Sequence, residues 1–211
     1  ICSDSPYRFV ASGSPLSWYA FACGFPLIEP ASADFAWVNQ GTGSLDATYG
    51  GIYVAAPAAA GANLRILKRA APSTPYTITA AFLLNLYPVA SMNAGLCFRQ
   101  LSDGKLVIYG PMGLPGFVMN AQKFNSPTSF NSTYVQNAEV WAAVRSAMIW
   151  LRIADDGSNR ICSWSNDGRH WQVFHTVGRT DFLTADEVGF YADANQATYD
   201  SGVWLLNWAQ G

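Results

Sequence analysis

The sequence predicts an all-β fold with two stacked antiparallel sheets. Short runs rich in Val, Ile, Phe, Tyr and Thr recur between clusters of Gly, Pro, Asn and Asp, a pattern typical of β-sandwiches. The sequence shows no repeat of fixed period, which argues against a solenoid or a propeller. With 211 residues, the chain has the length of one large β domain. We therefore expect one sandwich domain with an N-terminal extension.

Eleven segments have the β-branched and aromatic composition of strands. In chain order they are FAWVN (35–39), GGIYVAA (50–56), LRILKR (64–69), YTITAAFLLN (76–85), AGLCFRQ (94–100), KLVIYG (105–110), MIWLRIA (148–154), NRICSWS (159–165), HWQVFHTV (170–177), EVGFYAD (187–193) and VWLLNW (203–208). Residues 111–136 contain three prolines and little periodicity, which predicts a long, partly ordered loop. Residues 138–148 have the spacing of a helical turn, or they lead into the next strand.

Side chains alternate between the two faces of a strand, so each predicted strand divides into two sets. Four strands have one purely apolar set that we expect in the core, namely Leu96 with Phe98, Leu106 with Ile108, Leu151 with Ile153 and Val188 with Phe190. If these strands are neighbours, one outer face carries Arg99, Tyr109, Arg152, Tyr191 and Asp193. Rings beside hydrogen-bonding groups suit a sugar, and equally they suit a bare sheet surface or a protein interface.

The segment SWSNDGRHW (163–171) predicts a hairpin, because Asp-Gly favours a type I′ turn between β-prone runs. In that register Cys162 pairs with Val173, and Trp164 pairs with Trp171 on the outer face unless a bulge buries them. The segment also resembles the sialidase Asp box, whose pattern is Ser-x-Asp-x-Gly-x-x-Trp. It lacks the residue between Asp and Gly, so it is not an Asp box. The candidate ligand-binding residues are Arg99, Tyr109, Arg152, Trp164 and Tyr191.

The composition limits the classes of partner. Only 12% of the residues are charged and the formal net charge is −2, so the sequence offers no basic surface for nucleic acid. No apolar run is long enough for a membrane span. Low charge and abundant aromatic residues are typical of large subunit interfaces, so we expect a homo-oligomer. Because the chain begins at Ile1, we expect it to be part of something longer.

Neither a metal site nor a catalytic site is indicated. The four cysteines form no CxxC pair, although Cys2 and Cys23 could close a disulfide in an oxidising compartment. Calcium would need oxygen donors that the sequence does not show to converge, namely Asp155, Asp156, Asp193, Asn195 and Asp200. The three glutamates form no E-x-D-x-x-E signature, which disfavours a retaining glycosidase. We expect no cofactor and no enzymatic activity.

Five segments carry a family resemblance: WVNQGTGSLDATYGGIYVAAP, PYTITAAFLL, GLCFRQLSDGKLVIYG, WLRIADDGSNRICSWSNDGRHW and EVGFYAD. Together they resemble concanavalin A-like lectin/glucanase jelly-roll domains, especially those of bacteriophage virion and tail proteins. The resemblance covers about residues 35–208, and NDGRHW and VGFYAD are its most specific parts. It implies two curved antiparallel sheets, with carbohydrate recognition common in the family and catalysis confined to some branches.

Residues 1–34 lie outside this resemblance and contain four prolines, so we expect an arm or tether before a jelly-roll domain over residues 35–211. The function expected is that of a non-catalytic phage virion component (a tail fibre, spike or head decoration) that binds glycan on the host surface. The alternative is a purely structural virion protein that contacts other subunits, and a glycan hydrolase or lyase is the least supported reading. The expected location is the virion or the extracellular space.

Overall fold

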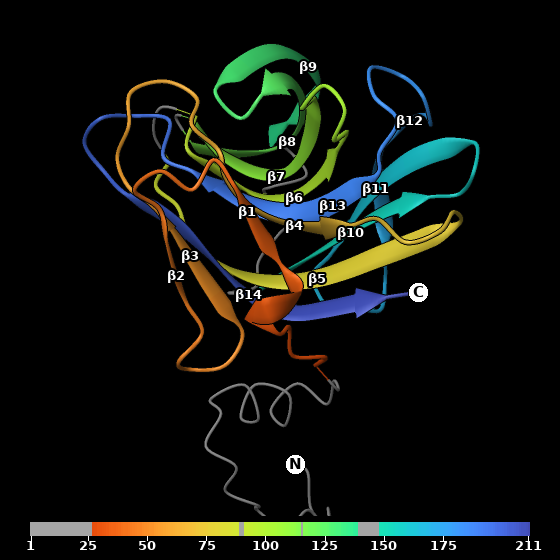
Figure 1. The fold of residues 1–211 in the computed structure, drawn as a ribbon, viewed down its shortest axis with the longest axis horizontal. Coiled ribbons are helices and arrows are strands. Elements are labelled where there is room, and N and C mark those ends of the chain that lie inside the picture. The colour runs from red at the N-terminus through yellow and green to blue at the C-terminus, as the bar shows by residue number, and fades with distance from the viewer. Residues whose placement is uncertain (1–26, 89–90, 115, 139–147) are drawn as a thin grey trace, which may run out of the picture.

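The protein is a sandwich of two antiparallel sheets with seven strands each, as Figure 1 shows. The computed structural model describes residues 27–88, 91–114, 116–138 and 148–211. The all-β, two-sheet prediction is confirmed. Among the described residues, no helix has the length and apolar character needed to cross a membrane. Two predictions fall outside the described residues. They are the Cys2–Cys23 pair and the helical turn over 138–148, of which only the two end residues are described.

Sheet A forms one layer and combines the consecutive strands β6–β9 with three strands from earlier and later parts of the chain. Its strands, in spatial order, are β1 (Ala36–Val38), β4 (Arg65–Ala70), β13 (Glu187–Asp193), β6 (Asn93–Arg99), β7 (Leu106–Leu114), β8 (Gly116–Ser126) and β9 (Ser129–Asn137). A 3-10 turn, η1 (Ser32–Asp34), precedes β1.

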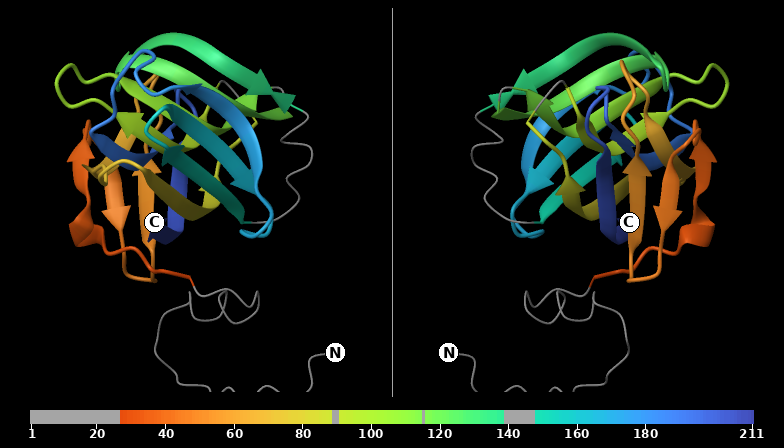
Figure 2. Two further views of the ribbon diagram at one scale, coloured as in Figure 1. Left: turned by 90° about the vertical axis from the view of Figure 1, so that its right-hand side faces the viewer. Right: turned by 90° about the vertical axis from the view of Figure 1, so that its left-hand side faces the viewer.

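Sheet B forms the other layer, and its order brings distant parts of the chain together. Its strands are β12 (Gln172–Gly178), β11 (Asn159–Ser165), β10 (Ile149–Asp155), β5 (Tyr76–Asn85), β14 (Ser201–Gln210), β3 (Ile52–Ala56) and β2 (Ser44–Asp46). The views in Figure 2 show β2 and β3, in orange, at one side of the molecule and β10–β12, in cyan and blue, at the other.

The core lies between the sheets and consists of alternate residues from both. Six of the eight residues predicted to face it do so, namely Leu96, Phe98, Leu151, Ile153, Val188 and Phe190. Aromatic rings fill its centre: the ring of Phe190 lies 6.2 Å from that of Phe82, and the ring of Phe35 lies 5.1 Å from that of Trp208. Burying each such side chain contributes about 1.5–3 kcal/mol, which makes this layer the main source of stability.

The prediction for β7 is wrong. Tyr109 lies opposite Leu96 and Val107 opposite Phe98, so Tyr109 and Val107 point into the core. Leu106 and Ile108 point outward, where they join a second buried group, the outer cluster, formed by Leu64, Ile66, Cys97, Leu106, Ile108, Phe124 and Tyr191. Because β7 is apolar and buried on both faces, its alternation could not show which face is the inner one.

The prediction of a loop over 111–136 is also wrong. β7 continues to Leu114, and β8 and β9 form a hairpin that pairs with it. β8 directs Met119 and Ala121 to one face, and its other face carries the amides Asn120 and Gln122, all of them buried. A strand that buries amides as well as apolar groups has no hydrophobic period to recognise. β9 is a mostly polar edge strand.

Candidate functional site

The five predicted ligand-binding residues do not share a face. Arg99 and Tyr191 belong to strands of sheet A, and Arg152 belongs to β10 of sheet B. Tyr109 and Trp164 lie in the core between the sheets, with 0% and 5% exposure. The prediction of one outer face that carries Arg99, Tyr109, Arg152, Tyr191 and Asp193 is therefore wrong. It failed because adjacent segments in the sequence were assigned to one sheet, whereas β10 pairs with β5 and β11.

On sheet A the predicted residues serve the fold. The Glu187 carboxylate pairs with Lys68 Nζ at 2.5 Å and with the Arg99 guanidinium, and its side chain is only 7% exposed. Tyr191 is completely buried in the outer cluster, and this burial raises the pKa of its phenol well above the ordinary value. Breaking a buried ion pair leaves an uncompensated charge, so this group is a structural requirement rather than an open site.

The segment 163–171 is a hairpin, but its register differs from the predicted one. Trp164 lies opposite Gln172 and Ser163 opposite Val173, one position away from the expected pairing. A bulge follows, because Cys162 lies opposite His175 and leaves Phe174 as the extra residue. Trp164 consequently enters the core, whereas Trp171 packs against the separate cluster of Ala81, Trp150 and Leu206.

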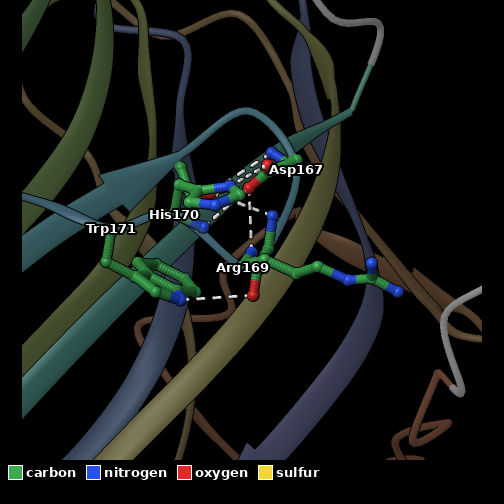
Figure 3. Close-up of polar contacts among 6 residues, drawn as sticks. Asp167, Arg169, His170 and Trp171 are labelled. Atoms are coloured by element: carbon green, nitrogen blue, oxygen red, sulfur yellow. Dashed lines mark hydrogen bonds and ion pairs between the residues drawn. The ribbon is translucent and has the colours of Figure 1, made fainter.

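Side chains close this hairpin, which explains why the two-residue turn does not form. The Ser165 hydroxyl accepts the backbone N–H groups of Asp167 and Gly168 at 3.2 and 2.9 Å. The Asp167 carboxylate accepts the N–H groups of Arg169 and His170 and contacts His170 Nδ1 at 2.6 Å (Figure 3). These hydrogen bonds hold the pKa of Asp167 far below its ordinary range, and the bond with the His170 side chain has the largest effect.

Arg152 is likewise held within the structure. Its guanidinium lies 3.7 Å from the centre of the Trp171 ring, and its Nε donates to Thr79 Oγ1 at 3.0 Å. The Trp171 indole donates in turn to the carbonyl of Gly168 at 3.2 Å. The cation of Arg152 and the ring of Trp171 therefore stabilise each other within the protein.

A different part of sheet B forms a hollow that the sequence analysis missed. It is lined by Asp46, Tyr49, Tyr53 and Trp204 and has a volume of about 230 Å³. Strand register explains how these residues meet: Asp46 lies opposite Tyr53 in β3, and Tyr53 lies opposite Trp204 in β14. The three side chains thus form one row across neighbouring strands, at the edge of the sheet where β2 and β3 are labelled in Figure 1.

The turn between β2 and β3 completes the hollow. Gly50 and Gly51 both have positive φ, at 82° and 67°, which side chains other than glycine rarely tolerate. The Trp204 indole donates to the Gly50 carbonyl at 2.8 Å, and the Gly51 N–H donates to Glu29 Oε1 at 3.0 Å. These two bonds tie the turn to β14 and to the preceding segment, and the adjoining Tyr49 stays 61% exposed at the rim.

The walls of the hollow are aromatic and have a defined geometry. The Tyr53 and Trp204 rings meet edge to face, with centroids 6.4 Å apart and an interplanar angle of 76°. The Tyr53 ring lies over Gly202, where a Cβ atom would stand 2.2 Å from the Tyr53 hydroxyl. That hydroxyl accepts a bond from Asn85 Nδ2 at 3.4 Å. The missing side chain at Gly202 therefore makes room for this wall.

Asp46 supplies the charge of the hollow. Its Oδ1 accepts the backbone N–H of Thr48 at 2.8 Å. Bonds from the Thr48 side chain and backbone lower the pKa of Asp46 below its ordinary value, so the carboxylate is ionised at neutral pH. The lining therefore combines apolar ring faces with one anionic acceptor.

Three of the carboxylates considered for calcium, those of Asp155, Asp193 and Asp200, take part in other contacts. Asp155 pairs with Arg179 at 2.8 Å, and Asp193 Oδ1 accepts the N–H groups of Asn63 and Asn195. Asp200 accepts the N–H of Ala58. Within the described ranges, no three His, Cys, Asp or Glu side chains gather where they could hold a metal ion.

Fold and hollow together define a jelly-roll-like β-sandwich with an aromatic surface site. No protein-family model matches the sequence, and the search of curated proteins returned no match. Solved structures do match. A functionally unknown protein from Saccharomyces cerevisiae is 14% identical with a TM-score of 0.65, and the alignment covers 86% of this chain and 98% of that one.

Two bacterial structures share the fold as well. The GH43 BlXynB protein from Bacillus licheniformis is 11% identical with a TM-score of 0.65, over 87% of this chain and 37% of that one, so the present chain corresponds to a minor part of its length. The carbohydrate-binding module CBM66 from Bacillus subtilis is 11% identical with a TM-score of 0.53, over 84% and 94% of the two chains. At these identities the likeness establishes the fold.

Proposed function

We propose that the protein is a non-catalytic carbohydrate-binding module whose ligand occupies the hollow of Asp46, Tyr49, Tyr53 and Trp204. The observation that carries this proposal is the exposed Tyr49 ring beside the fixed corner of Tyr53 and Trp204. Sugar rings present flat CH faces that stack on aromatic side chains, and their hydroxyls bind carboxylate oxygens. The likeness of fold to CBM66 supports the same class of ligand.

The hollow suits one sugar unit of a longer chain. Its volume of about 230 Å³ lies just below the usual range of small-molecule pockets, about 300–1,000 Å³. The site opens at the edge of sheet B, so the rest of a glycan can extend into solvent. Tyr53 and Trp204 are fixed by packing and hydrogen bonds, which reduces the entropy lost on binding.

The lining supports binding rather than hydrolysis. Glycosidases usually place two carboxyl groups about 5–9.5 Å apart across the scissile bond. Among the described residues that line the hollow, Asp46 is the one carboxylate. We therefore propose a binding function without catalysis.

The biological setting is proposed from the sequence resemblance to phage domains. In this proposal the chain is a component of a tail fibre, a spike or a head decoration, and its ligand is glycan on the surface of a bacterial host. The second candidate is a scaffold that contacts other subunits. The edge strand β12 favours it, because an exposed sheet edge can pair with another chain and Val173 on that strand is 66% exposed. A monomeric mass in light scattering would contradict the scaffold candidate.

A broad glycan array followed by calorimetric titration tests the binding function. For any glycan that binds, Tyr49→Ala should weaken affinity about tenfold, which corresponds to about 1.4 kcal/mol. Phe130→Ala is a matched control, because Phe130 is a half-exposed aromatic residue on the opposite sheet. Binding that Tyr49→Ala leaves unchanged, or a chain that binds no glycan, would refute the proposal.

A further inference from the structure

The chemistry of the same hollow also indicates the charge of its ligand. We propose that it selects a cationic ammonium group, either the free amine of an amino sugar or a quaternary ammonium head group. For the sugar, the inference rests on the proposed function, because it specifies which unit of a glycan the hollow accepts. For the ammonium group itself, it rests on the rings and the carboxylate alone.

The first step is the arrangement of the rings. Three aromatic side chains come from three elements: Tyr49 from the turn, Tyr53 from β3 and Trp204 from β14. The edge-to-face contact of Tyr53 and Trp204 makes two walls that meet at an angle. The face of an aromatic ring attracts a cation through its quadrupole, and several rings around one space form a cage for N-methylated or protonated amines.

The second step is the charge of the lining. Asp46 stands opposite Tyr53 and is held ionised by its bonds from Thr48. The carboxylate of Glu29 lies outside the lining and accepts the N–H of Gly51 in the adjoining turn. Arg65 approaches the start of the hairpin at Gly43, but it is buried and donates to the Asn39 carbonyl at 2.9 Å. The four described lining residues include no lysine or arginine.

The third step compares this site with other rings in the protein. Other aromatic rings of the protein are paired with a cationic side chain of the same chain. The Arg152 guanidinium lies 3.7 Å from the centre of the Trp171 ring, and Lys123 Nζ lies 4.4 Å from the centre of the Tyr134 ring. Of the cation–π contacts among the described residues, none involves Tyr49, Tyr53 or Trp204. The hollow thus has the anionic and aromatic half of such a contact, and the ligand would supply the cation.

The fourth step concerns hydrogen bonding. A neutral sugar needs both donors and acceptors for its hydroxyls, whereas an ammonium group needs acceptors or ring faces only. Asp46 is an acceptor only, whereas the Tyr53 hydroxyl, which accepts a bond from Asn85, keeps its own O–H to donate. The negative charge of Asp46 beside the rings, rather than a lack of donors, is therefore what favours an N–H or N-methyl cation over a neutral hydroxyl.

The experiment titrates the full chain with paired charged and neutral probes, of which the small pair has equal shape. The small probes are choline and its uncharged carbon analogue 3,3-dimethyl-1-butanol, and the glycan probes are a glucosamine tetramer and its fully N-acetylated form. We expect each cation to bind at least about fivefold more tightly than its neutral partner. Asp46→Asn should remove most of this difference, because the amide keeps the acceptor for Thr48 but carries no charge. Tyr49→Phe should retain binding, and Tyr49→Ala should lose it.

The outcomes separate the two proposals. If the glucosamine tetramer binds and the acetylated form does not, both proposals stand. If acetylated or neutral glycans bind through Tyr49 as tightly as the amine, the glycan function stands and the ammonium inference is wrong. If choline binds and no glycan does, the ammonium site stands and the carbohydrate function is wrong. If no probe binds, or if Asp46→Asn leaves the preference for cations unchanged, the ammonium inference is refuted.

Discussion

Asp193 at the end of β13 should make the stability of the protein fall as pH rises. Its side chain is completely buried, with Oδ1 accepting the N–H groups of Asn63 and Asn195 at 3.1 and 3.0 Å. Its Oδ2 has no hydrogen-bond partner among the described residues. Asp193 lies opposite Asn93 of β6, and the Oδ1 atom of Asn93 likewise has no hydrogen-bond partner there. Burial raises the pKa of Asp193 to about 7. A protonated Oδ2 could donate to an acceptor such as Asn93, whereas an ionised one could not.

The magnitude follows from the difference between the folded and unfolded pKa values. The unfolded chain releases this proton near pH 3.9, whereas the folded protein keeps it until about pH 7. Between these values the native state binds more protons, so the free energy of unfolding decreases with rising pH. About three pKa units at 1.36 kcal/mol each give a loss of about 4 kcal/mol between pH 4 and pH 8.

The variant Asp193→Asn isolates this effect, because the amide keeps Oδ1 as an acceptor and places an uncharged donor at the second position. Urea unfolding followed by tryptophan fluorescence at pH 4, 5.5, 7 and 8.5 gives the free energy of unfolding for both proteins. The difference in free energy of unfolding, variant minus wild type, should increase by about 4 kcal/mol from the lowest to the highest pH. Other titrating groups, such as His175, contribute equally to both curves and cancel. Parallel curves over the whole range would refute the reasoning.

Two further substitutions test the hollow and the hairpin. Gly202→Ala places a Cβ 2.2 Å from the Tyr53 hydroxyl, so it should displace that ring and weaken glycan binding about tenfold; titration of the variant measures this, and unchanged affinity would show that Tyr53 is not needed. Ser165→Ala removes the acceptor of two backbone N–H groups and should lower the free energy of unfolding by about 1 kcal/mol; urea unfolding measures it, and a neutral effect would mean that water replaces the hydroxyl.

Sequence periodicity predicted those parts of the fold in which one strand face is clearly more apolar than the other. The inward positions of β6, β10 and β13 follow from this contrast. It failed for β7, because Leu106 and Ile108 are as apolar and as buried as Val107 and Tyr109. It failed for β8 and β9, because a strand with buried amides and a polar edge strand lack any hydrophobic alternation.

The candidate site was beyond sequence reasoning for a different reason. Tyr53 and Trp204 are separated by about 150 positions and meet only because β14 inserts beside β3. Asp46 lies on a strand of three residues, too short to show a pattern. The one local signal was Asp46 followed by two tyrosines around the Gly50–Gly51 step, a spacing that places aromatic groups on both sides of a tight turn.

The position of β14 has a consequence for the order in which the molecule is made. This strand, residues 201–210, lies inside sheet B between β5 and β3. During synthesis the β2–β3 hairpin leaves the ribosome early but has no neighbour in its sheet until those late residues emerge. Trp204, which then binds the turn at Gly50, also completes the aromatic corner. Ligand binding would therefore report that the chain has been translated through β14 and folded. A product that stops before residue 201 would carry Tyr49 and Tyr53 but lack Trp204, so it could not form the hollow.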